Sequence, residues 1–157
     1  MELKELVDGF ATTLGLEGLT LDNEGVAVFE ADEMLVRISD QPQTRTFVLE
    51  GEIGEPPLEC RDQFERSLLR LNLALLPSSS VSIALAEDEA YVLQAVCGYE
   101  NLAQEAFVER IKSFLDELER IRTLLGSFAP ASEELAEEAE VAAAEARSAS
   151  FGGFIQV

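Results

Sequence analysis

The segment between residues 19 and 53 constrains the fold most, because apolar and polar residues alternate along it in four short runs. These runs lie at about 19–22, 26–30, 34–39 and 46–53. They are separated by NEG, ADE and DQPQTR, which are rich in turn-forming and acidic residues. Alternation with a period of two, interrupted by such turns, predicts an antiparallel β-meander. The following GEPP closes the meander, because proline cannot continue a central strand.

Three other segments repeat their apolar residues every three or four positions, which predicts helices. The first covers residues 1–14 and ends at Gly15, the second runs from about 58 to 76, and the third begins at Asn101 and runs to Gly126. We expect Asn101 to cap the third helix, because its short polar side chain suits that position.

Between the second and third helices, SVSIALAED and AYVLQAVC alternate again around the turn EDE, which predicts a further antiparallel pair. The expected order is α-β-β-β-(β)-α-β-β-α, with the strand in parentheses optional. This order predicts a single α+β domain built on a twisted antiparallel sheet.

The composition changes near Pro130, so we expect a domain at 1–128 and an acidic, mobile tail at 129–157. Six glutamates and one arginine lie in the tail, with no large apolar stripe. Its Ala/Glu-rich part, 132–147, is typical of nascent helix, and the tail ends in the apolar FGGFIQV. Removal of residues 130–157 should leave the thermal stability almost unchanged, because little apolar area would be lost.

The carboxylates around Gly25 do not match a calcium loop of the EF-hand type. With Gly25 at the sixth position, Thr20 stands first and Ala31 twelfth, where acidic ligands are required. The other acidic clusters fall at predicted hairpin tips, where solvent keeps carboxylates ionised. The chain has no histidine, and Cys60 and Cys97 are too few for a zinc site, so we expect buried structural thiols. We expect no catalysis, metal or cofactor.

The formal net charge of −20 also restricts the partners. Such a field repels phosphate backbones and anionic lipid surfaces, which argues against binding to nucleic acid or membranes. No apolar run is long enough to span a bilayer, and MELKELVDGF lacks the basic start of a signal peptide. The sequence therefore predicts a cytoplasmic protein that binds other proteins.

The second helix carries two apolar stripes. Phe64, Leu68, Leu71 and Leu75 form one stripe, and Leu69, Leu73 and Leu76 form another roughly 140° away at 100° per residue. The first stripe can pack on the sheet of the same chain, and the second needs another cover. The same helix of a second subunit would provide it, which predicts a homodimer. The alternative is that the helix is buried on all sides within one monomer.

Both faces of the meander also carry large apolar residues. In the third run Val36 faces one way and Leu35 the other, and in the second run Val28 opposes Phe29. One interpretation is that one face is covered by helices and the remaining apolar residues are scattered, as on any surface. The other is an apolar patch, rimmed by acids, that receives an extended peptide. The pattern alone leaves both open.

The element order, the acidic charge, the first helix ending in FATTLGL and the meander LDNEG...F..DE..LVRIS together resemble the class I chaperones of type III secretion systems, the Tir-chaperone (CesT-like) family. The resemblance covers residues 1–126. It implies a bacterial homodimer without enzymatic activity. Such a dimer binds the N-terminal chaperone-binding segment of an effector in extended form, keeps it soluble and delivers it to the secretion ATPase.

The resemblance also implies positions for the two binding surfaces. For the dimer interface these are Leu69, Leu73, Leu76, Val81 and Ile83. For effector binding they are Phe10, Leu14, Phe29, Leu35, Val36 and Phe47. The number of effectors served does not follow from the sequence. A regulatory or sensory protein-binding domain of the same fold, without a role in secretion, is the alternative.

Overall fold

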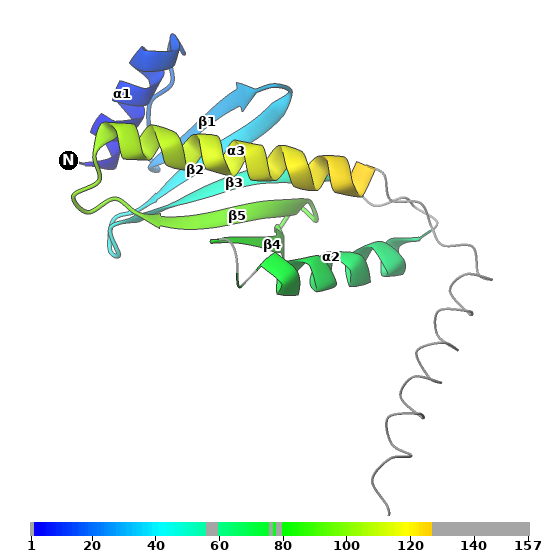
Figure 1. Ribbon diagram of the computed structural model, residues 1–157. Coiled ribbons are helices and arrows are strands. Elements are labelled where there is room, and N and C mark those ends of the chain that lie inside the picture. The colour runs from blue at the N-terminus through cyan, green and yellow to red at the C-terminus, as the bar shows by residue number, and fades with distance from the viewer. Residues whose placement is uncertain (1, 56–59, 76, 78–79, 127–157) are drawn as a thin grey trace, which may run out of the picture.

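A computed structural model describes residues 2–55, 60–75, 77 and 80–126 of the chain (Figure 1). Its elements, in order, are α1 (Leu3–Leu14), β1 (Val26–Ala31), β2 (Met34–Gln41), β3 (Thr46–Gly54), α2 (Arg61–Leu75), β4 (Val81–Leu85), β5 (Tyr91–Gly98) and α3 (Gln104–Gly126). The predicted α+β class is confirmed, and the elements follow the predicted order with three strands instead of four between the first two helices. The predicted tail, 129–157, lies outside the described residues.

All five strands form one antiparallel sheet in the order β1-β2-β3-β5-β4. The β1–β2 hairpin turns through two residues, Asp32 and Glu33, which both have positive φ, of 48° and 63°. Two left-handed residues define the tight turn whose twist matches that of the flanking strands. This turn fixes the register, with Ala31 opposite Met34 and Phe29 opposite Val36.

The strand predicted at 19–22 is wrong. This segment is irregular, and Asp22 organises a turn with its own side chain. The Asp22 carboxylate accepts hydrogen bonds from the backbone N–H groups of Glu24 (2.8 Å) and Val26 (2.9 Å). An aspartate that bonds the backbone two residues on favours a turn over a strand. Asp22 is one of the acidic residues near Gly25 that were compared with a calcium loop. Its carboxylate holds the turn that leads into β1.

The predicted start of the third helix at Asn101 is also wrong. Asn101 has a φ of 57° and lies in a turn in which the Leu102 N–H donates to the Tyr99 carbonyl (3.1 Å). Asparagine tolerates this left-handed conformation better than most residues, which is why a capping residue and a turn residue look alike in sequence. Helix α3 begins at Gln104 instead.

One face of the sheet is buried and the other is not. We call inner the face with Phe29, Val36, Ile38, Phe47 and Leu49, and outer the face with Val28, Leu35, Arg37 and Glu50. Helices α1 and α3 pack together on the inner side, with α3 over β3 (Figure 1). The ring of Phe107 in α3 lies 6.1 Å from that of Phe10 and 5.2 Å from that of Phe47. This aromatic cluster joins both helices to the sheet.

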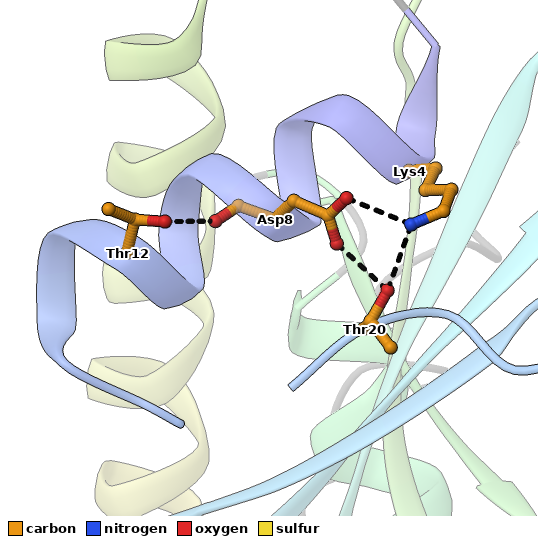
Figure 2. Close-up of polar contacts among 4 residues, drawn as sticks. All are labelled: Lys4, Asp8, Thr12 and Thr20. Atoms are coloured by element: carbon orange, nitrogen blue, oxygen red, sulfur yellow. Dashed lines mark hydrogen bonds and ion pairs between the residues drawn. The ribbon is translucent and has the colours of Figure 1, made fainter. Parts of the chain in front are cut away.

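Helix α1 is held in place at two points. On its inner side, the Gln104 side-chain amide donates to the Leu6 carbonyl (3.0 Å), which links α1 to the start of α3. On its solvent side, the Asp8 carboxylate accepts bonds from Lys4 Nζ (2.9 Å) and Thr20 Oγ1 (2.8 Å), as Figure 2 shows. The bonds from Lys4 and Thr20 lower the pKa of Asp8. Because Thr20 follows the helix, this group fixes the path of the chain between α1 and β1.

Candidate functional site

The acidic clusters noted in the sequence lie on exposed turns of the sheet. Glu87, Asp88 and Glu89 lie on the β4–β5 turn, and Asp32 and Glu33 lie on the β1–β2 turn. Within the described ranges, no three histidine, cysteine or acidic residues lie close enough together to hold a metal ion. Cys60 and Cys97 are buried. The features that stand out on the surface are apolar, and they lie on α2 and on the outer face.

Helix α2 turns one apolar stripe inward and the other outward. Phe64, Leu68 and Leu75 are buried, whereas the side chains of Leu69 and Leu73 are 70% and 71% exposed. This division agrees with the two stripes predicted from the helical wheel, since only one of them meets the sheet of the same chain. Leu76 lies outside the described residues. Of the other predicted dimer contacts, Val81 is buried and Ile83 is half-buried.

A side chain of α2 closes the outer edge of β4. Asn72 accepts a hydrogen bond from the Ile83 N–H (2.9 Å) and donates one to the Ile83 carbonyl (3.4 Å). An unpaired strand edge can form hydrogen bonds with another strand. At the centre of the β4 edge, the backbone groups of Ile83 are instead bonded to Asn72. The two hydrogen bonds also hold α2 beside β4, and Leu69 and Leu73 lie on the exposed side of α2. A cavity of about 220 Å³ lies between the helix and the strand, next to Leu69, Leu85 and Tyr91.

At the other end of this contact, Tyr91 donates a short hydrogen bond of 2.6 Å to the Glu65 carboxylate. The Tyr91 ring lies edge-on to Phe64, at 5.4 Å between centroids. Burial of the ring, and then the bond to Glu65, raise the pKa of Tyr91. The bond from Tyr91, and then the one from Arg61, lower the pKa of Glu65. Both shifts favour a protonated phenol bonded to an ionised carboxylate at neutral pH.

The outer face carries a groove of about 750 Å³ between β1–β2 and the β4–β5 turn. Its apolar lining includes Val28, Leu35, Leu85 and Val92, and its charged lining includes Arg37, Glu50, Glu52, Glu87 and Asp88. Val28, Leu35 and Leu85 are each half-exposed or more, and Val92 is buried beneath them. Leu85 also lines the cavity beside α2. The groove and the exposed stripe of α2 therefore meet at Leu85.

The structure divides the six predicted effector-binding residues between core and surface. Phe10, Phe29, Val36 and Phe47 belong to the buried core, at 7% exposure or less. Only Leu14, at 52%, and Leu35, at 58%, reach the surface. Leu14 lies at the end of α1, and Leu35 lies in the outer groove, so they are on different faces of the molecule. The four core residues cannot touch a partner directly in this conformation.

The groove also contains residues that the sequence analysis did not assign to the site. Val28, Leu85 and Val92 line it together with Leu35. Strand alternation predicts that Val28 and Phe29 point to opposite faces. The sequence therefore places Val28 on the face opposite to Phe29. Val28 could have been assigned to the groove only if it were known that the helices cover the face of Phe29.

At the second sheet edge, β1 has no partner strand on its outer side among the described residues. The Asp40 N–H donates to the Gly25 carbonyl (2.8 Å), and this bond sets the phase of the β1–β2 ladder. In an antiparallel ladder alternate residues bond the partner strand, so the backbone groups of Val28 and Glu30 point away from β2. The N–H and carbonyl of Val26 point the same way but are bonded by Asp22.

These features define a class of protein: a small α+β domain that presents apolar side chains and a short strand edge to other polypeptides. Residues 5–122 match the model of the Tir chaperone protein (CesT) family. The match covers most of the chain, so the chain belongs to this family of type III secretion chaperones, which is a chaperone family and not an enzyme family. No curated protein matches the chain.

Solved structures of the same fold include three complexes. The first is the ExsC–ExsE complex, with 24% identity and a TM-score of 0.67 over 80% of this chain and 97% of that one. The HopA1–SchA chaperone–effector complex has 21% identity and a TM-score of 0.64 over 77% and 93%. The Yersinia pestis type III secretion chaperone SycH, in complex with a fragment of YscM2, has 21% identity and a TM-score of 0.57 over 75% and 98%.

Among the described residues, no helix is long and apolar enough to cross a membrane.

Proposed function

We propose that this chain is a cytoplasmic type III secretion chaperone of a bacterium. As a homodimer, it binds the N-terminal chaperone-binding segment of one or more effectors in extended form. It keeps the effector soluble and competent for secretion, and it performs no chemistry on it. The observation that carries this proposal is the groove on the outer face of the sheet, where the exposed side chains of Val28 and Leu35 lie beside the carboxylates of β3 and of the β4–β5 turn. Family membership and the complexes of similar fold support it.

An extended client suits the groove for a geometric reason. Its side chains alternate between two directions, so every second residue can reach Val28, Leu35 and Val92. Its basic residues can approach Glu50, Glu52 and Glu87, which also line the groove. Apolar burial contributes about 25 cal/mol per Å² before ordering costs, and ordering a disordered client costs about 2–5 kcal/mol. A short contact is therefore insufficient, and the client must cover a large surface.

The open edge of β1 provides a second type of contact. The backbone groups of Val28 and Glu30 are available to a further strand, and Val28 also lines the groove. A client that adds a strand to β1 gains backbone hydrogen bonds that do not depend on its sequence. Apolar pockets then supply the specificity. Helix α2 blocks the middle of the opposite edge through Asn72, so the geometry directs strand addition to β1.

Client binding is tested by a substitution that changes the groove without changing the core. Leu35→Asp places a charge on an exposed residue of the groove, and we expect it to weaken binding of an effector N-terminal segment at least tenfold. Phe29→Asp is unsuitable, because Phe29 is buried and an unpaired core charge would unfold the domain. Binding is measured by isothermal titration calorimetry.

The matched control is Val96→Asp, which places the same charge on β5. Val96 is 62% exposed and does not line the groove. We expect this variant to bind like the wild type. Equal binding by folded Leu35→Asp protein would exclude the groove. Failure of the wild type to bind any secreted protein would favour the regulatory-domain alternative.

The homodimer is assigned to the outward stripe of α2. Leu69 and Leu73 are more exposed than any other large apolar residue in the described ranges, and they lie side by side, four positions apart. Arg66 and Arg70 lie on the same exposed side of the helix. We expect Leu69→Asp to convert the dimer to monomer, because a desolvated unpaired charge costs several kcal/mol. Light scattering at tens of micromolar should show the monomer mass, and Val96→Asp should remain dimeric. A monomeric wild-type protein would exclude the dimer.

A further inference from the structure

The carboxylates of the outer groove are complementary to one part of the chain itself. All six glutamates after Pro130 lie between residues 133 and 145, and Arg147 is the only charged residue from 146 to 157. Residues 151–157, FGGFIQV, carry two phenylalanines, an isoleucine and a valine. We propose that this segment docks in the outer groove of its own chain and competes there with the client. The docking depends only on the groove, whereas the competition rests on the proposed function.

The match between groove and segment is one of charge and polarity. Leu35 and Val28 are exposed in the groove and have no partner over them among the described residues. Glu50 and Glu52 on β3 and Glu87 and Asp88 on the β4–β5 turn outnumber Arg37 in the groove, so the groove repels the Glu-rich part of the chain and attracts Arg147. The exposed stripe of α2 has the opposite preference, because Arg66 and Arg70 flank its leucines. Of the two exposed apolar surfaces, the groove therefore fits residues 146–157 better.

The length of chain before the segment allows it to reach the groove. About 25 residues separate Gly126, at the end of α3, from Phe151. A flexible chain of that length spans about 25–30 Å on average, and a domain of this size has a radius of gyration of about 14 Å. Tethering then gives the segment a local concentration on the order of millimolar.

Tethering makes even a weak contact effective. If the free segment binds the groove with a Kd of about 0.1 mM, a local concentration of about 1 mM fills roughly nine-tenths of the grooves. Only the remaining tenth would be open to a client, so the apparent affinity for the client falls about tenfold. Tight clients would displace the segment and weak ligands would not. In the absence of a client, the segment would cover the exposed side chains of Val28 and Leu35.

The docking is tested first without any client. A full-length variant with Phe151→Ser, Phe154→Ser and Ile155→Ser keeps the charge and length of the tail but removes its anchors. A fluorescent peptide of residues 146–157 should bind this variant, and it should bind the wild type about tenfold more weakly, because there the groove is occupied. Fluorescence anisotropy measures both. Equal binding to the two proteins, or no binding to the variant, would overturn the docking.

The position of docking is tested by adding one charge to the same full-length variant. With Leu35→Asp the peptide affinity should fall at least tenfold, and with Val96→Asp it should not change. Equal affinity in the Leu35→Asp protein would overturn the groove as the site. In the wild type, the occupied fraction should be independent of protein concentration. A fraction that rises with concentration, together with a larger mass in light scattering, would assign the segment to a second copy and overturn docking within one chain.

The competition is tested last, with an effector N-terminal segment. The variant without anchors should bind it about tenfold more tightly than the wild type does. If the peptide experiments succeed and no client binds either protein, the proposed function fails and the docking stands. If a client binds both proteins equally, the competition is overturned.

Discussion

Leu35 and Val36 are neighbours in β2 and differ by one methylene, yet the first is 58% exposed and the second is completely buried. The same contrast separates Val28 from Phe29 in β1. The inner residues pack under α1 and α3, whereas the outer ones line a groove. An apolar side chain in the groove adds little to the folding of the monomer, because its surface remains in water. Its usefulness must lie in contacts with another polypeptide.

Strand alternation therefore separates the two tasks of the sheet. Even positions of β2, such as Val36, serve stability and odd positions, such as Leu35, serve binding, and in β1 the assignment is reversed, because the side-chain period is two. A substitution on the inner face should change the free energy of unfolding, and one on the outer face should change binding. This division between the two faces can be tested experimentally, because residues on each face can be replaced one at a time.

The largest effect on stability is expected for Phe47→Ala. The Phe47 side chain is fully buried on the inner face and contacts the ring of Phe107. Loss of a buried phenylalanine should lower the free energy of unfolding by about 3–5 kcal/mol. Urea denaturation followed by circular dichroism measures the change.

The paired variant is Leu35→Ala on the outer face. Surface substitutions usually change the stability by about 0.5 kcal/mol or less, so this variant should unfold near the wild-type midpoint. Similar losses in the two variants would mean that the outer face also belongs to the core, and the division between the faces would be wrong.

A smaller effect is expected for Gly51→Ala, which tests how closely α3 packs on the inner face. A Cβ atom at Gly51 would overlap the side chain of Leu118, which is itself fully buried. Such overpacking typically costs about 1–3 kcal/mol. The control is Gly98→Ala in β5, where an added Cβ meets no atom within 4 Å. Equal urea midpoints for both variants would show that α3 can shift at this contact.

Much of the fold follows from hydrophobic periodicity, which predicted three helices, two hairpin regions and their order. The two wrong predictions, the strand at 19–22 and the helix start at Asn101, concern short polar side chains that can form hydrogen bonds in more than one backbone conformation. Asp22 bonds to the backbone and forms a turn instead of extending a strand, and Asn101 adopts a left-handed turn instead of capping a helix. In both cases the choice depends on hydrogen bonds that the residue types permit but do not determine.

The candidate site was only partly predictable for a different reason. The alternation in β1 and β2 shows that Phe29 and Val28 face opposite ways, but it does not show which side the helices cover. That choice is tertiary, since it depends on the Phe10–Phe29 contact at 5.4 Å and on the position of α3. The helical wheel of α2 was more informative. A helix with two apolar stripes can turn only one toward its own sheet, so an exposed stripe follows from the sequence alone.

The smallest effect is expected at the border between covered and uncovered surfaces, where Tyr91 and Glu65 meet. The Tyr91 ring belongs to the core, and its hydroxyl donates to the solvent-accessible Glu65 carboxylate. The pKa of Glu65 is lowered from its ordinary value of 4.5, by the bond from Tyr91 and then by Arg61. A carboxyl group with a lowered folded-state pKa stabilises the fold above its unfolded-state pKa. This contribution is lost as the pH falls through the folded-state pKa.

Glu65→Gln should therefore unfold at a lower urea concentration than the wild type at pH 7, and the difference should shrink as the pH falls below 4.5. Glutamine keeps an oxygen that can accept the Tyr91 hydrogen bond but loses the charge that attracts Arg61, so the comparison isolates the ionised form. The control is Glu119→Gln, an exposed carboxyl group on α3, which should differ little from the wild type at either pH. A Glu65→Gln difference that stayed constant from pH 7 to pH 3 would show that shape, and not charge, joins α2 to the inner face. The bond between Tyr91 and Glu65 would then be a consequence of the packing of Phe64 on Tyr91 and not a cause of it.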